Sequence, residues 1–224
     1  MQERAVSQAS VAGLSALETS KVLRNTYMLL GMTLLFSAMC AGVSVAMGVQ
    51  PINFIVFFVG VIGLSFLVNF TANSAWGLLS VFLFTGFIGF FAGPMISAVT
   101  TAVPHGGESV VMALGTTAIA FVGLSAYAVI SKKDFSFMTG FIQIGIWAML
   151  GAIVLGFFFD LGVFQLVISA SVVILMGALM LWQTSAIIHG GETNYILATT
   201  TLFMSIYNMF ISLLNLFLAF GGDD

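Results

Sequence analysis

Long apolar runs, interrupted only by short polar breaks, occupy the chain from Tyr27 almost to its end. A helix needs about 20 apolar residues to cross a hydrocarbon core of ~30 Å. The run from Phe137 to Trp182 is too long for one crossing, so we expect it to turn back at Asp160 and Gly162. The pattern therefore predicts seven membrane-spanning helices, over residues 27–48, 51–70, 76–99, 109–130, 137–159, 162–182 and 195–220.

The composition places these runs in a lipid bilayer. Only 6% of the residues are charged, 60% are hydrophobic, and the mean hydropathy is +1.17. In a soluble domain about a quarter of the residues are charged. In lipid the backbone must satisfy its own hydrogen bonds, which favours helices. The alternation typical of outer-membrane barrel strands is absent. We therefore predict an all-α integral membrane protein, and the lack of a basic patch excludes nucleic acid as a partner.

The basic residues predict how the chain is oriented. Arg4, Lys21 and Arg24 precede the first span, and Lys132 and Lys133 follow the fourth. Loops rich in Lys and Arg stay on the cytoplasmic side of a membrane protein. Because an even number of spans separates the two segments, the charges predict a cytoplasmic N-terminus and a C-terminus on the opposite side.

The N-terminal segment is the one sizeable part outside the apolar runs. We predict a cytoplasmic tail over residues 1–24 and a transmembrane domain over residues 25–224. Residues before Ser15 are rich in Ser, Gln and Ala, which is typical of an unstructured segment. Residues 15–18 match a capping box, in which Ser and Glu side chains satisfy free backbone N–H groups. Either the first helix begins near Leu17, or this short match is a coincidence.

Two faces of the predicted spans carry small or polar residues at helical spacing. The third span has Gly86, Gly89 and Gly93 on one face, followed by Pro94, which indicates close packing against a neighbouring helix or a hinge. The last span carries a stripe of polar residues, and such a stripe is costly in lipid. We expect that span to be central, with its stripe either bonding other helices or lining a narrow hydrated path. The stripe consists of Thr201, Ser205, Asn208, Ser212 and Asn215.

One tetrapeptide occurs twice, as His105 to Glu108 and as His189, Gly190, Gly191 and Glu192. The predicted topology places the two copies on opposite sides of the membrane, so they cannot share one metal ion, and each alone has too few ligands. Two interpretations remain, an inverted-topology repeat or a chance match of common loop chemistry.

The sequence lacks the signatures of intramembrane enzymes. It has no His-Glu-x-x-His helix for zinc, no aspartate inside a span, and no histidine inside a span to activate a serine. Cys40 has no second cysteine to pair with. We therefore predict no enzyme activity, no metal and no cofactor.

Several segments resemble one family of membrane proteins. The run from Ile187 to Ala198 contains the sequence His-Gly-Gly-Glu-Thr-Asn-Tyr, and its part from Ile187 to Tyr195 is the most specific of them. On these segments the chain resembles the Bax inhibitor family, and within it the bacterial YccA-like branch. The other segments are Lys21 to Tyr27, Thr85 to Phe87, Met112 to Gly115, Ser125 to Tyr127, and Lys133 to Phe137.

The resemblance implies a fold, a location and partners. It implies a bundle of six helices around a central last helix, in the bacterial inner membrane, with a periplasmic C-terminus. The YccA-like branch is implied to bind the membrane-anchored ATP-dependent protease FtsH, as substrate and competitive regulator, in company with HflK and HflC. A tail over residues 1–14 would then be the segment that the protease grips.

The wider family also implies an alternative function, a calcium leak controlled by a pH-sensitive pair of aspartates. The motif alignment places Gln183 and Ser205 at those two positions. Neither side chain titrates, and the second span has no basic residue to partner an acid. The alternative is therefore a cation leak that lacks the di-aspartate pH sensor.

Overall fold

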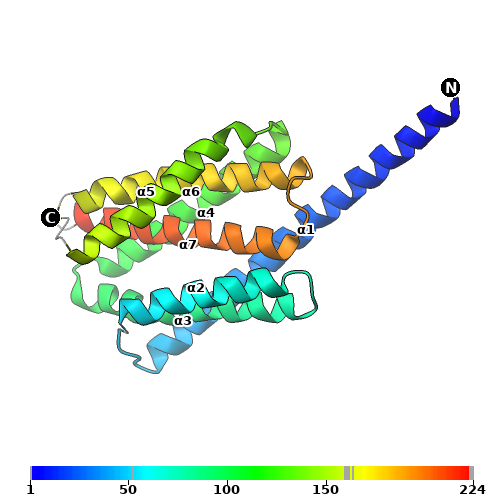
Figure 1. Ribbon diagram of the computed structural model, residues 1–224. Helices are drawn as coiled ribbons and strands as arrows, with labels where there is room; N and C mark the ends of the chain where they lie inside the picture. Colours follow the sequence, from blue (N-terminus) through cyan, green and yellow to red (C-terminus); the bar gives the residue numbers. More distant parts are fainter. Residues whose placement is uncertain (1, 52, 159–161, 163, 222–224) are drawn as a thin grey trace.

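Seven long apolar helices form a bundle, as the hydropathy pattern predicts (Figure 1). The computed structural model describes residues 2–51, 53–158, 162 and 164–221. Its helices are α1 (Gln2–Ala46), α2 (Phe54–Thr71), α3 (Trp76–Ala102), α4 (Gly106–Ser131), the 3-10 turn η1 (Ser136–Met138), α5 (Thr139–Phe158), α6 (Phe164–Ile188) and α7 (Tyr195–Phe220). No strand occurs within those ranges. By length and composition all seven helices can span a membrane.

The first helix is longer than the sequence pattern predicts. α1 begins at Gln2, so the expectation of an unstructured segment before Ser15 is wrong for this structure. The segment contains good helix formers such as Ala, Gln, Glu and Arg, and adding turns to an existing helix avoids the cost of nucleation. The start of α1 extends well beyond the other helices (Figure 1).

The C-terminal end of α6 lies further along the chain than the sequence pattern predicts. α6 continues past Trp182 to Ile188, because the hydropathy pattern measures the apolar thickness and not the whole length of a helix. The predicted turn at Asp160 lies outside the described residues. Beside it, Gly162 has a φ of 45°, a backbone conformation that glycine adopts without steric cost.

The glycine face of α3 packs against α1. A Cβ atom at Gly89 would meet the carbonyl oxygen of Ser37, and one at Gly93 would lie 2.6 Å from the carbonyl oxygen of Ala41. Only glycine lets the two backbones approach so closely. Pro94 lies inside α3, which continues to Ala102. The structure thus confirms the packing interpretation of this face.

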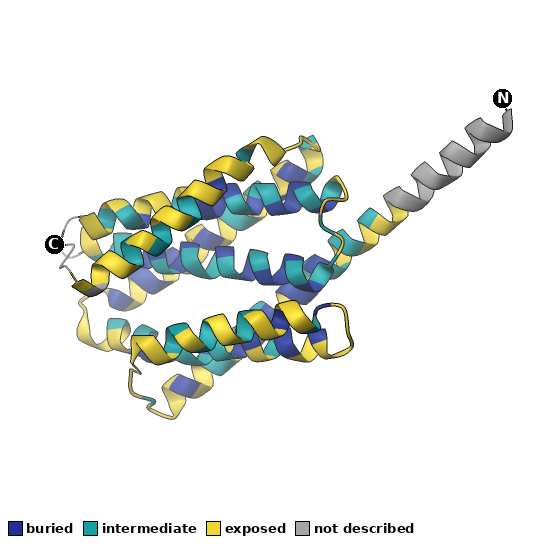
Figure 2. Ribbon diagram, viewed as in Figure 1, coloured by how far each residue is buried: buried dark blue, intermediate teal, exposed yellow. Residues whose placement is uncertain are grey.

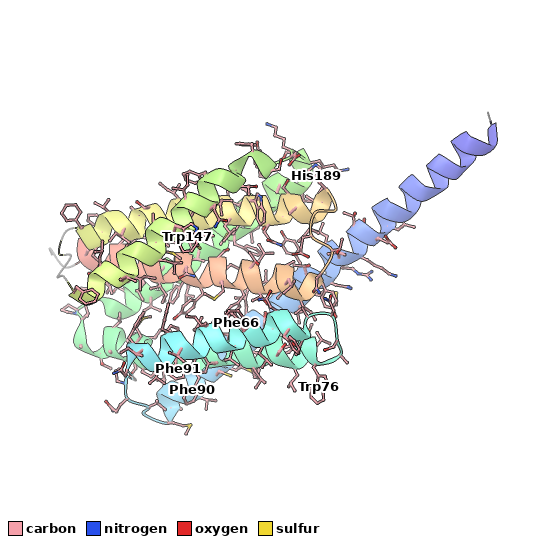
Figure 3. The ribbon with its side chains drawn as sticks, in the orientation of Figure 1. Phe66, Trp76, Phe90, Phe91, Trp147 and His189 are labelled. Atoms are coloured by element: carbon pink, nitrogen blue, oxygen red, sulfur yellow. The ribbon has the colours of Figure 1, made fainter. Side chains whose placement is uncertain are left out.

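The buried residues gather along α3, α6 and α7, whereas α2 and α5 are mostly exposed (Figure 2). α7 contacts α1, α2, α3, α4 and α6; α5 contacts α6 and η1. The arrangement of six helices around a central α7 therefore stays a prediction. Large apolar side chains such as Phe66 on α2 and Trp147 on α5 point away from the bundle, as expected for surfaces that face lipid (Figure 3).

Candidate functional site

The polar stripe of α7 faces protein. Ser205 is fully buried and Ser212 nearly so, while the other three stripe residues are partly buried. The Ser205 hydroxyl donates a hydrogen bond to the carbonyl oxygen of Thr201 at 2.8 Å, and the Asn208 amide donates to that of Met204 at 2.8 Å. Both bonds stay within α7, so these two side chains are satisfied locally and do not tie helices together.

The C-terminal half of the stripe lines a cavity of about 490 Å³ between α5, α6 and α7. Phe54, at the start of α2, and apolar side chains such as Met149 and Ile153 complete its wall. Among the described lining residues none has an ionisable side chain, so these residues offer hydrogen-bonding groups without charge. Its polar lining consists of Gln165, Ser169, Asn208, Ser212 and Asn215.

The two positions where the family resemblance implies aspartates both lie in the core. Gln183 on α6 is 3% exposed, Ser205 on α7 is 0% exposed, and these two helices pack against each other. The Gln183 side-chain nitrogen has no hydrogen-bond partner. Buried polar atoms nearly always have a hydrogen-bond partner. An amide nitrogen without one in the core therefore indicates a position where a water molecule binds or where the neighbouring helices rearrange.

Ser185, two residues further along α6, joins the α4–α5 connection to the end of α6. Its hydroxyl accepts a hydrogen bond from the backbone N–H of Phe135 at 3.0 Å and donates one to the carbonyl oxygen of Lys133 at 3.1 Å. Nearby, the Thr184 hydroxyl lies 3.1 Å from the hydroxyl of Tyr27 on α1. α1, α4 and α6 are thus connected at one end of the bundle.

The α4–α5 connection also carries a perturbed acid outside the spans. The Asp134 carboxylate accepts a hydrogen bond from the backbone N–H of Ser136 at 2.8 Å. Bonds from Ser136, with a smaller contribution from nearby His189, hold the pKa of Asp134 below its ordinary value. Asp134 is therefore ionised at neutral pH and binds the backbone N–H of the first residue of η1.

The second copy of the repeated tetrapeptide forms the tight turn between α6 and α7. The His189 ring nitrogen Nδ1 lies 2.9 Å from the carbonyl oxygen of Ser185, which can only accept, so Nδ1 carries the proton. Gly190 has a φ of 75°, and the Glu192 carboxylate accepts a hydrogen bond from the Asn194 backbone N–H at 2.7 Å. The motif is a structural connection between two spans.

Asn194 then starts α7 and ties it to the α2–α3 connection. Its side-chain oxygen accepts hydrogen bonds from the backbone N–H groups of Ile196 and Leu197, which caps the helix. Its side-chain nitrogen donates to the carbonyl oxygen of Ala72 at 3.1 Å and to the side-chain oxygen of Asn73 at 2.9 Å. One amide thus fixes the start of α7 against α2.

The first copy of the tetrapeptide adopts a different structure. His105 has a φ of 54° and precedes α4, and its ring lies 3.3 Å from the Glu108 carboxylate at an exposed position. Gly106 is the first residue of α4 here, whereas Gly190 lies in a turn after α6. The two copies share no local structure, so this match gives no support to an inverted repeat.

The sequence pattern alone assigns no role to Ser185, Thr184 or Asn194. The available signals were the polar triplet after Trp182 and an asparagine directly before an apolar helix. Neither signal identifies a partner, because the partners lie on α1 and on the connections that flank α3 and α5. Within the described residues no three His, Cys, Asp or Glu side chains gather as a metal site would require.

Comparison with known proteins identifies the family. The sequence model described as "Inhibitor of apoptosis-promoting Bax1" matches residues 19–222. An uncharacterized protein of Pseudomonas aeruginosa is 49% identical over 207 residues, which cover 92% of this chain and 93% of the relative. The Escherichia coli K12 protein named "Modulator of FtsH protease YccA" is 44% identical over 210 residues, 94% of each chain. A relative from another Escherichia coli strain, also 44% identical over 210 residues, is named "Inner membrane protein YccA".

These matches extend over the spans and both ends of the bundle. Together with the seven apolar helices they identify a multi-pass membrane protein. The chain belongs to the Bax inhibitor family and is similar throughout to the YccA proteins.

Proposed function

We propose that this protein binds and modulates the membrane-anchored protease FtsH in the bacterial inner membrane, as substrate and competitive regulator, in company with HflK and HflC. The observation that carries the proposal is the 44% identity to the FtsH modulator of Escherichia coli, over 94% of both chains. The proposed role is not enzymatic, and the protein acts through binding.

The shape of the chain suits a protein that an ATP-driven unfoldase can grip but not easily extract. The start of α1 extends beyond the bundle (Figure 1). An isolated helix without packing partners is only marginally stable in water, which makes it a usable starting point for unfolding. The spans resist extraction because α3 packs closely against α1 and because α7 contacts five other helices. A bundle pulled slowly through the protease would occupy it and slow its turnover of other substrates.

The orientation needed for this role follows from the charges. Arg24 on α1 lies at the same end of the bundle as the last turns of α4, because residues from both segments line one groove, and Lys132 and Lys133 directly follow α4. The positive-inside rule predicts that this end, and with it the N-terminus, faces the cytoplasm.

Deletion of residues 2–14 tests whether the protease begins unfolding the protein at its N-terminal segment. We expect a markedly longer half-life in cells that contain FtsH, because the protease loses its starting point. Replacement of the same residues by a Gly/Ser segment of equal length is the matched control and should restore degradation if length and not sequence matters. An unchanged half-life after the deletion would contradict the proposal.

Co-purification tests the binding separately. The intact chain, extracted from native membranes in mild detergent, should retain FtsH, and an ATPase-inactive FtsH should trap more of it. A bundle that retains no FtsH under both conditions would rule out a direct complex.

The polar cavity favours a second candidate, a cation leak. Amide and hydroxyl groups from α6 and α7 line this cavity, and the fully buried Ser205 lies one helical turn before Asn208 on α7. Neutral groups at Gln183 and Ser205 would make such a leak insensitive to pH. Calcium flux into proteoliposomes at two pH values tests this candidate, and a steep pH dependence of the unaltered chain would overturn it.

A further inference from the structure

A groove of about 500 Å³ lies between α1 and α4, apart from the polar cavity and from the α6–α7 turn. Arg24 and Leu23 line it from α1, and Ser125, Val129 and Ile130 line it from α4. Ile130 is 81% exposed, so the groove opens toward the side of the bundle, where lipid lies. Arg24 is the one ionisable cation among the lining residues.

The groove lies at the level of a membrane interface. Tyr27 lines it, and hydrogen bonds connect this level to Thr184 on α6 and, through Ser185, to Lys133 after α4. Tyr and Trp side chains collect where headgroups meet the hydrocarbon, and Lys and Arg collect on the cytoplasmic edge. This end of the bundle carries Tyr27, Trp76, Tyr127, Trp182, Tyr195, Lys132 and Lys133.

Two polar groups in the groove lack partners among the described residues. Ser125 is 6% exposed, and its hydroxyl has no hydrogen-bond partner. Arg24 has no carboxylate within ion-pair distance among the described side chains, and His105 with Glu108 is the sole pair found there. A buried hydroxyl costs free energy when it is left unpaired, and a guanidinium at a membrane interface binds oxyanions through several donors.

We propose that this groove binds the phosphodiester headgroup of an anionic phospholipid of the adjacent leaflet. Arg24 pairs with the phosphate oxygens, and the Ser125 hydroxyl donates a hydrogen bond to the same headgroup. The acyl chains lie along the apolar lining of Leu23, Val129 and Ile130, which a free phosphate ion would leave uncovered. Basic pockets between spans at the cytoplasmic side are suited to such headgroups. This proposal does not depend on the proposed binding of FtsH.

Native mass spectrometry of the full chain in detergent, with added phosphatidylglycerol or phosphatidylcholine, tests the site. We expect retained phosphatidylglycerol and a raised melting temperature with that lipid, because a ligand that binds only the folded state stabilises it. Arg24→Gln should lose most of this retention. Lys132→Gln is the matched control, since it removes the same charge at the same end of the bundle from an exposed residue outside the groove.

Two further arms separate the groove from general charge attraction. Ser125→Ala leaves the charge unchanged and should weaken phosphatidylglycerol retention, because the headgroup loses a donor. Inorganic phosphate alone should not shift the melting temperature. The proposal is overturned if both lipids are retained equally, if Arg24→Gln and Lys132→Gln lose retention to the same extent, or if free phosphate reproduces the shift.

Discussion

At the scale of single residues, a few polar side chains near one end of the bundle connect segments that are far apart in the chain. Ser185 both accepts from Phe135 and donates to Lys133. Asn194 caps α7 and donates to Ala72 and Asn73. Such bonds are stronger where water is excluded, and removing one partner leaves the other buried and unpaired.

Ser185→Ala should destabilise the protein by ~1–3 kcal/mol, because the buried N–H of Phe135 loses its acceptor. Ser171→Ala is the control on the same helix, since the Ser171 hydroxyl is exposed and bonds only its own helix at Val167. Thermal unfolding in one detergent, followed by loss of monomer, measures both variants. Equal midpoints for the two variants would show that the Ser185 bonds contribute little.

At the scale of helices, the packing of α1 on α3 depends on missing side chains. Gly89 lies against the backbone of Ser37, and Gly86 against the ring of Phe36. In lipid the hydrophobic effect does not press helices together, so close van der Waals contact contributes most of their association. The face is therefore sensitive to the addition of a single methyl group.

Gly89→Ala should destabilise the bundle by ~1–3 kcal/mol, because the new Cβ would overlap the carbonyl oxygen of Ser37. Gly115→Ala on α4 is the control, since nothing lies within 4 Å of a Cβ placed there. That change should be neutral or stabilising by up to ~1 kcal/mol. Unfolding midpoints of the two variants decide the matter, and a stable Gly89→Ala protein would show that α1 can move aside.

At the scale of the whole molecule, the described core between α6 and α7 contains no acidic or basic side chain, and this sets how the protein responds to pH. Gln183 and Ser205 keep the core neutral at every physiological pH, although the family resemblance implies acids at both positions. A buried carboxylate carries a large desolvation cost when it ionises, and two of them repel. The unaltered chain avoids both effects.

The double variant Gln183→Asp with Ser205→Asp should therefore gain a pH dependence that the unaltered chain lacks. Raising the pH would ionise a buried pair and loosen the packing of α6 on α7, so we expect a lower unfolding midpoint at high pH and a calcium flux that changes with pH. The double variant Gln183→Asn with Ser205→Asn keeps the polarity without the charge and serves as the control. A pH response in that neutral variant would contradict the explanation.

Much of this protein was already determined by its sequence. Hydropathy alone sets seven spans, because the thickness of the bilayer imposes one length on every helix that crosses it. Helix periodicity places the glycines of α3 on one face and the polar residues of α7 on another. The run from Ile187 to Ala198 also carried enough specific residues to indicate the family.

Only the tertiary structure decided what these features contact. On the polar stripe of α7, Ser205 and Asn208 donate hydrogen bonds to the backbone of their own helix. The C-terminal half of the stripe lines a cavity. Ser185 and Asn194 connect distant segments of the chain, because their hydrogen-bond partners lie far away in the sequence. The groove at Arg24 likewise exists because α1 and α4, separated by two other spans in the sequence, both contribute to its wall. Periodicity specifies which face of a helix is polar, but the neighbour of that face depends on how all seven helices pack.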